Sequence, residues 1–186
     1  MAEFELPTDR LLLRSWQPAD RAPFAAMNSD IAVMEYFPAL LTVDESDALI
    51  LRFQAEFAAR GFCPWAIEER VTGTFIGFVG LRDVPDNLSF APGVEVGWRL
   101  ARPFWGRGYA TEAASAALTF GFETVGLTEI VSYTSAINLR SRRVMERLGM
   151  SRNPADDFEH PNVATANLLR PHVLYRFRGA ERRASS

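Results

Sequence analysis

GVEVGWRLARPFWGRGYA, the segment from Gly93 to Ala110, decides the fold of this chain. Its first part alternates apolar and polar residues, as a strand with one buried face does, with these apolar residues on one face: Val94, Val96, Trp98 and Leu100. Pro103 ends the strand, and Gly106 and Gly108 allow the backbone to turn. The run TEAASAAL, which begins at Thr111, has strong helix propensity. The segment therefore predicts a strand, a glycine turn and a helix.

A glycine turn that leads into a helix is a potential anion site. The first backbone N–H groups of a helix are free, and the helix dipole favours negative charge beside them. The turn lacks the Gly-Lys-Ser/Thr ending of a nucleoside-triphosphate loop, and its Gly-x-Gly-x-Ala is shorter than the dinucleotide fingerprint. Taken alone, it is also consistent with a plain strand-to-helix connection.

A second helical unit, Asn138–Met150, adds weight to the phosphate interpretation. It begins with an asparagine suited to cap a helix, repeats apolar residues at helical spacing, and ends at Gly149. The strand, the turn and this helix, in that order, form a recognisable set.

This set resembles the GCN5-related N-acetyltransferases (GNAT), and within them the branch of ribosomal-protein N-terminal acetyltransferases of the RimJ/RimL type. The resemblance covers nearly the whole chain, from TDRLLLRSW at Thr8 to PHVLYRF at Pro171. In the superfamily the turn reads Gln/Arg-x-x-Gly-x-Gly/Ala, and its backbone amides bind the pyrophosphate of acetyl-coenzyme A. Trp105 replaces the polar first residue here, so only the backbone part of this cradle carries over.

The resemblance implies one α/β domain over residues 1–178, with 179–186 as a loose tail. Its core is a mixed, mostly antiparallel sheet of about seven strands, flanked by helices. The strand of Glu95 and the strand beginning at Glu129 are expected to separate and hold acetyl-coenzyme A. Sequence patterns place the strands near 10–15, 65–69, 74–81, 94–100, 129–134 and 171–177, and the helices near 18–28, 43–60, 111–124 and 138–150. Residues 151–171 form a long loop, of a length typical of lids or binding elements.

Composition agrees with one enzyme domain. A chain of 186 residues is long enough to bury about 70% of its unfolded surface, and a hydrophobic fraction of 48% argues against disorder. No apolar run approaches the ~20 residues of a membrane span. The net charge of -3 is spread along the chain, which predicts no nucleic-acid partner. The acidic N-terminus and a single cysteine, Cys63, favour the cytoplasm.

Glu95 is the candidate general base. An ammonium group, with a pKa of ~10.4 for lysine or ~7.7 for an α-amine, must lose its proton before it attacks a thioester. The resemblance implies that an acid on this strand takes part, whereas the alternative is a solvated or ion-paired carboxylate. Attack is expected to be direct, with the acetyl carbonyl polarised by backbone N–H groups near Gly97 to Arg99. Cys63 has no neighbouring histidine in the sequence to activate it.

Ser141 is the candidate proton donor to the leaving thiolate. Many superfamily members use a tyrosine of the second helix, but the matching residue here is Met145, which cannot donate a proton. Ser141 lies three residues after Asn138, on the same helix face. The alternatives are that Ser141 is a surface hydroxyl and that water protonates the thiolate.

The remaining candidates contact ligands. The expected cofactor-binding residues are Trp98, Arg99, Leu100, Trp105, Gly106, Arg107, Gly108, Tyr109, Ala110, Thr111, Asn138 and Arg143. Tyr36, Phe37 and His160 are weaker candidates for the acceptor side. No metal is expected, because His160 and His172 are too far apart, in a loop and a strand, and lack a further ligand at metal-binding spacing.

The predicted reaction is acetyl transfer to a primary amine, either a small molecule or a protein N-terminus, by a monomer or homodimer. Two alternatives stay open. One is a non-catalytic coenzyme A sensor that keeps the Gly106 turn but uses Glu95 structurally. The other is an acyltransferase with a different acyl donor or a hydroxyl acceptor.

Overall fold

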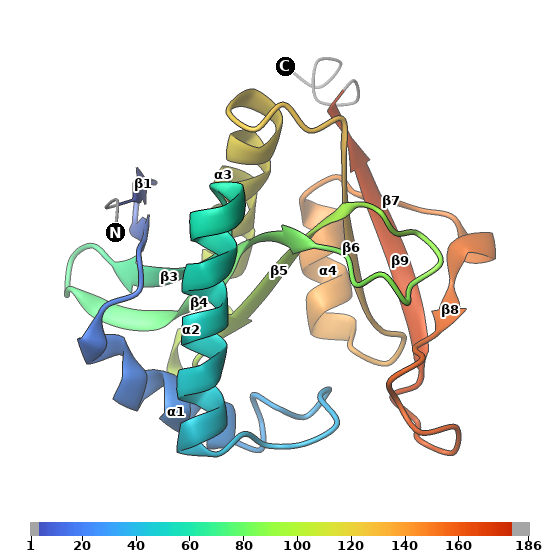
Figure 1. Ribbon diagram of the computed structural model, residues 1–186, viewed down its shortest axis with the longest axis horizontal. Helices are drawn as coiled ribbons and strands as arrows, with labels where there is room; N and C mark the ends of the chain where they lie inside the picture. Colours follow the sequence, from blue (N-terminus) through green and yellow to red (C-terminus); the bar gives the residue numbers. More distant parts are fainter. Residues whose placement is uncertain (1–3, 180–186) are drawn as a thin grey trace.

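A nine-stranded sheet runs through the computed structural model, which describes residues 4–179. The strands are β1 (Glu5–Pro7), β2 (Leu11–Arg14), β3 (Pro64–Glu69), β4 (Thr74–Asp83), β5 (Val94–Leu100), β6 (Glu129–Ser135), β7 (Ser151–Arg152), β8 (Phe158–Glu159) and β9 (Pro171–Arg178). Their order is β1-β2-β3-β4-β5-β6-β9-β7, and β8 pairs with β9 (Figure 1). All pairings are antiparallel except that of β5 with β6. The predicted fold class is confirmed, with β1, β7 and β8 added to the expected strands.

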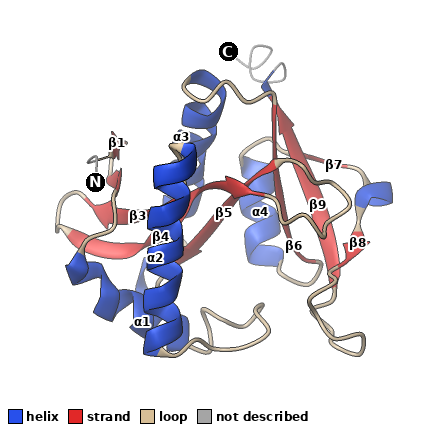
Figure 2. Cartoon of the chain, in the orientation of Figure 1, coloured by secondary structure: helices blue, strands red, loops and turns tan. Residues whose placement is uncertain are grey.

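Helices cover both faces of this sheet (Figure 2). They are α1 (Arg21–Ser29), α2 (Val43–Arg60), α3 (Tyr109–Glu123) and α4 (Leu139–Arg147), with short 3-10 turns at Pro18–Asp20, Arg102–Phe104 and Pro154–Asp156. Figure 1 shows α2 in front of the sheet and α3 behind it. Polar contacts agree with this arrangement, because Arg82 of β4 bonds to Glu56 of α2.

Local sequence signals explain where the helices begin and end. A capping box of Thr42 and Glu45 starts α2, and Gly61, with a left-handed φ of 75°, ends it, as predicted. Helix α3 begins two residues before the predicted start, because Gly108 is its N-cap, with a φ of 80°. Helix α4 ends at Arg147 rather than at Met150, since the chain turns through Gly149.

The predicted loop 151–171 is partly built into the sheet. Strand β7 pairs with β9 at Ser151–Arg176, and β8 pairs with β9 at Phe158–His172. Strands of two residues are too short to show an alternating pattern, which is why the sequence did not reveal them. Between β7 and β8 the chain forms the 3-10 turn Pro154–Asp156, and 160–170 remain as an irregular segment.

The main core lies between the sheet and its helices. Trp65, Phe24, Phe53 and Ile130 are among its fully buried side chains. Within residues 4–179, each helix is too short or too polar to cross a bilayer. The predicted loose tail lies almost entirely in 180–186, outside the described residues.

Candidate active site

Strands β5 and β6 are joined at one end and separate at the other. In the described residues, the pairing of β5 with β6 has one pair of register partners, Glu95 and Val131. Just beyond it, the Ser132 hydroxyl donates a hydrogen bond of 2.9 Å to the carbonyl of Val96. From there the strands diverge (Figure 1), as the resemblance implied.

A cavity of about 660 Å³ opens where the strands separate. Its wall contains all the predicted site residues except Arg107: Tyr36, Phe37, Glu95, Trp98, Arg99, Leu100, Trp105, Gly106, Gly108, Tyr109, Ala110, Thr111, Asn138, Ser141, Arg143 and His160. The fold thus brings together residues from the loop after α1, from β5, from the glycine turn and from α4.

The glycine turn has the backbone that an anion cradle needs. Gly106 and Gly108 adopt φ values of 74° and 80°, which residues with a Cβ rarely adopt. Helix α3 starts at Tyr109, so the free N–H groups of its first turn belong to cavity-lining residues. Trp105 ties the turn to the preceding strand, because its indole N–H donates a 2.8 Å hydrogen bond to the carbonyl of Leu100.

Arg107 is the predicted site residue that the cavity wall does not include. Its guanidinium lies 3.7 Å from Glu69 and 5.4 Å from the ring centroid of Phe104. Glu69 also accepts a 2.6 Å hydrogen bond from the phenol of Tyr109. The side chain of Arg107 is therefore engaged beside the turn rather than in the cavity wall.

Asn138 is the N-cap of α4, as the sequence indicates. Its Oδ1 accepts a 3.2 Å hydrogen bond from the backbone N–H of Ser141, and its Nδ2 donates to Thr134 at 3.0 Å. One hydrogen of Nδ2 remains for a ligand. Met145, which is 1% exposed, and Ser141, in the first turn of α4, both line the cavity.

Glu95 is a largely buried carboxylate. Its side chain is 14% exposed, and burial raises its pKa above the ordinary glutamate value. Two neighbours oppose this shift: the phenol of Tyr133 and the guanidinium of Arg82, whose Nε lies 3.7 Å away. Tyr133 is a site residue that sequence reasoning missed. It lies on β6, two residues beyond Val131, the partner of Glu95, and this pairing gives no signal in the sequence.

Arg99 lies on the same face of β5 as Glu95, toward α1. Its Nη1 donates a 2.6 Å hydrogen bond to Oδ1 of Asn28, and its guanidinium carbon lies 4.1 Å from the ring centroid of Phe37. Burial lowers the pKa of Arg99 to about 10. The side chain thus faces α1 and the loop that follows it rather than the glycine turn.

His160 and His172 were expected to be too far apart to share a metal site, but the structure brings the two rings together. Because β8 pairs with β9, their ring centroids are 4.7 Å apart, and both rings lie beside Tyr133. Burial lowers the pKa of each imidazole. Within residues 4–179 no group of three His, Cys, Asp or Glu side chains is arranged to hold a metal ion.

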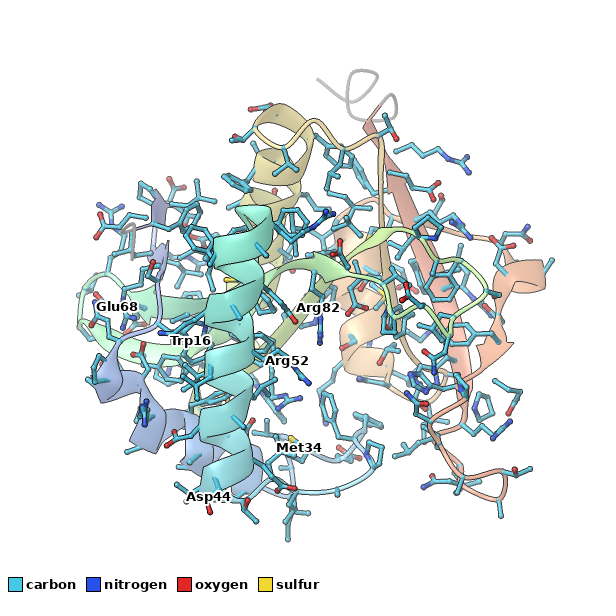
Figure 3. The ribbon with its side chains drawn as sticks, viewed as in Figure 1. Trp16, Met34, Asp44, Arg52, Glu68 and Arg82 are labelled. Carbon is cyan, nitrogen blue, oxygen red and sulfur yellow. The ribbon has the colours of Figure 1, made fainter. Side chains whose placement is uncertain are left out.

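The loop after α1 is tied to α4 across the cavity mouth. Arg140 bonds to Glu35 at 2.5 Å and stacks over the rings of Tyr36 and Trp105, at 5.3 and 4.6 Å from their centroids. Two further arginines of the cavity wall come from other elements: Arg52 from α2 and Arg82 from β4. Figure 3 shows Arg52 and Arg82 on the side of α2 that faces β5 and β6.

Comparisons with known proteins define the class. The model of the acetyltransferase (GNAT) domain matches residues 10–151. YkkB of Bacillus subtilis is 33% identical over 150 residues, which cover 80% of this chain and 86% of YkkB. The crystal structure of an acetyltransferase from Agrobacterium tumefaciens is 27% identical, covers 96% of both chains and has a TM-score of 0.77. RimL, a ribosomal L7/L12 alpha-N-protein acetyltransferase solved with coenzyme A, is 14% identical, with a TM-score of 0.74 over 94% of this chain and 98% of RimL.

The chain belongs to the GNAT acetyltransferase family. The likeness to RimL, at 14% identity, shows a shared fold.

Proposed function

We propose that this protein is an acetyl-coenzyme A-dependent N-acetyltransferase of the RimJ/RimL-like branch, which acetylates a primary amine by direct attack in a ternary complex. One observation carries the proposal. The buried carboxylate of Glu95 lies at the point where β5 and β6 separate, in the same cavity as the start of α3. A base and an anion cradle in one cavity are what amine acetylation by a coenzyme A thioester requires.

The cavity fits acetyl-coenzyme A. Backbone N–H groups of the turn and of the first turn of α3 would hold the pyrophosphate, and three arginines of α4 add positive charge to the wall: Arg140, Arg143 and Arg147. Asn138 presents its amide to the same space. When bound, the thioester supplies the acetyl group and a thiolate that leaves.

Glu95 would accept the proton of the acceptor ammonium. A base is most efficient when its pKa lies near the working pH, and burial moves the pKa of Glu95 upward. Arg82, placed between Glu95 and Glu56, holds the carboxylate in position.

The backbone of β5 offers one N–H group to the acetyl carbonyl. The N–H groups of a strand point alternately to its two sides. The carbonyl of Val96 accepts from Ser132 of β6, whereas the N–H of Ala101 bonds to Ile76 of β4. The N–H of Trp98 therefore points into the space between β5 and β6, within the predicted 97–99 region.

Ser141 would return a proton to the departing thiolate. It lies on the first turn of α4, beside Asn138, and lines the cavity. Tyr133, the other hydroxyl near the base, interacts with Glu95. This arrangement supports two separate groups for the two proton transfers.

A screen of acceptors tests the proposal. The purified protein is mixed with acetyl-coenzyme A and a panel of primary amines, with hydroxyl compounds of matched shape as controls. Thiol release and the mass of the acceptor are measured together. We expect acetylated amines and unchanged alcohols. Coenzyme A binding without turnover of any amine would favour a sensor and contradict the proposal.

A further inference from the structure

The acceptor side of the cavity contains an arginine whose charge has no carboxylate partner. We propose that the acceptor amine also bears a carboxylate, several bonds from the amine, and that Arg99 binds this carboxylate. The inference rests on the proposed function and names its substrate class.

Arg99 is held in place by a neutral group. The Ser46 hydroxyl donates to the carbonyl of Thr42, so it accepts from Nδ2 of Asn28. This fixes Oδ1 of Asn28 toward Arg99, which donates to it at 2.6 Å. Asn28 and Ser46 are both fully buried. The network orients the guanidinium but leaves its positive charge uncompensated.

An uncompensated buried charge is unusual and costly. Within residues 4–179, Asp and Glu side chains lie outside ion-pair distance of Arg99, and its Nε is buried without a hydrogen-bond partner. By contrast Arg14, which is 5% exposed, pairs with Asp20 at 2.8 Å. The counter-ion of Arg99 would therefore come from a ligand.

The charged residues of the cavity wall also indicate an anionic ligand. Six arginines and one acidic residue, Glu95, line the cavity. Three of these arginines belong to α4, near the glycine turn, and the others are Arg52, Arg82 and Arg99. Arg82 already bonds to Glu56 at 3.1 Å, and Arg52 lies 3.9 Å from the same residue. Arg99 is the acceptor-side cation left for an anionic group.

Strand geometry sets the spacing of the two ends of the acceptor. Glu95, Gly97 and Arg99 share one face of β5. Between the two charged residues the strand surface is unobstructed, because a Cβ built on Gly97 would meet nothing within 4 Å. The Cα atoms of Glu95 and Arg99 are about 13 Å apart along an extended strand. Phe37 covers one face of the guanidinium, so its N–H edge remains for a carboxylate. An amine at Glu95 with its carboxylate at Arg99 must therefore be a long molecule.

Matched acceptors test this assignment. One series contains ω-amino acids of increasing length, each paired with its ω-amino carboxamide. A second series contains peptides with an acidic or an amide side chain near the N-terminus, to distinguish a free amino acid from a peptide as the source of the carboxylate. We expect kcat/KM for at least one carboxylate to exceed that of its amide by roughly 10- to 100-fold, with an optimum in length.

Asn28→Asp is the decisive variant. It keeps the shape of the side chain but gives Arg99 an internal carboxylate, so the carboxylate-to-amide ratio of kcat/KM should fall to near one. Arg99→Gln should also lower this ratio, and it replaces Asn28→Asp as the test if that variant unfolds. Arg99→Lys keeps a positive charge and should retain part of the preference for the carboxylate. Arg52→Gln removes a more exposed arginine of the same wall and should keep the ratio.

Each result has a defined meaning. Equal acetylation of carboxylates and amides by the unaltered protein would overturn the inference and leave the proposed function standing. Equal losses in Arg52→Gln and Arg99→Gln would also overturn it, because they would assign the preference to the general potential of the cavity. Acetylation of no amine at all would overturn both proposals.

Discussion

The phenol of Tyr133 lies beside the carboxylate of Glu95, at the point where β5 and β6 separate. Burial and the nearby carboxylate raise the pKa of Tyr133, so the phenol stays protonated and acts as a donor. This interaction favours the ionised form of Glu95 and opposes the upward shift of its pKa caused by burial. If Glu95 is the base, as proposed, this pair influences the pH at which its carboxylate can accept a proton.

Glu95→Gln should separate binding from chemistry. The amide keeps the shape of the side chain but cannot accept the ammonium proton, so the rate should fall ~10²- to 10⁴-fold, while coenzyme A binding stays nearly intact. The loss should shrink as pH rises, since more acceptor is then already deprotonated. Steady-state kinetics from about pH 6 to 9.5 measures both effects. Activity within a few-fold of the unaltered enzyme across this range would remove Glu95 from the mechanism.

The same variant also has a stability readout. The folded-state pKa of Glu95 is raised, so the folded chain binds more protons than the unfolded chain between the two pKa values, and this contribution to stability is lost as pH rises through the folded pKa. Glutamine carries no such cost. The Tm of Glu95→Gln at pH 8 should therefore equal or exceed that of the unaltered protein. A clear fall in Tm would mean that any loss of activity reflects damage to the fold.

Tyr133→Phe should move the pH profile without abolishing activity. Removing the phenol removes an interaction that lowers the pKa of Glu95, so the acidic limb of kcat/KM should shift to higher pH. Activity lost near neutral pH should return in alkaline solution. Tyr175→Phe is the matched control, because Tyr175 also donates to a glutamate, Glu146, at 2.9 Å, and lies outside the cavity wall. Equal profiles for both variants would contradict the role of Tyr133.

Local signals in the sequence were enough for most of the fold. The capping box at Thr42 and the glycine at position 61 bound α2 at the predicted residues, since these signals act within a few positions of the chain. Gly106 and Gly108 likewise have the positive φ values that the turn required. Strands β7 and β8 escaped prediction, because two-residue strands are stabilised by pairing with β9 rather than by a pattern of their own.

The candidate site was predictable where it follows the chain and unpredictable where it depends on pairing. The turn and the cap at Asn138 are local features. The contact of Tyr133 with Glu95, the bond of Arg99 to Asn28 and the approach of His160 to His172 depend on which strands and helices become neighbours. Sequence spacing carries no such information.

Gly108→Val should abolish coenzyme A binding. Coenzyme A at ~100 times its Kd should stabilise the unaltered fold by about 2.7 kcal/mol, which for a domain of this size raises Tm by roughly 5 to 11 °C. A β-branched residue disfavours the φ of 80° and places a side chain beside the cradle. Gly126→Val is the control, because Gly126 has a φ of 79° but lies outside the cavity wall. It should share the backbone strain and keep the shift in Tm, whereas a shift retained by Gly108→Val would contradict the phosphate site.

Cys63→Ala should leave the reaction largely unchanged. Cys63 is 3% exposed, lies outside the cavity wall, and has a thiol pKa raised by burial, so its reactive thiolate is suppressed. The rate should stay within about threefold, in line with direct attack on the thioester. Mass spectrometry of the protein with acetyl-coenzyme A alone should show no acetylated enzyme. A covalent adduct on Cys63 that forms and decays at the catalytic rate would replace direct attack with a two-step mechanism.

Ser141→Ala should lower the rate less than Glu95→Gln does, and its loss should persist at high pH. The variant removes a proton donor to a thiolate that leaves readily, and water can substitute in part, so we expect a loss of roughly tenfold. Deprotonating the acceptor does nothing for the leaving group, so raising the pH cannot rescue this step. Ser115→Ala provides a control, since Ser115 is an exposed serine of α3 outside the cavity wall. The measurement is the kcat of Ser141→Ala and of Ser115→Ala, each divided by the kcat of the unaltered enzyme, from about pH 6 to 9.5 with one amine acceptor throughout. A loss that disappears as pH rises would assign Ser141 to the side of the base, and no loss at all would leave water as the proton donor.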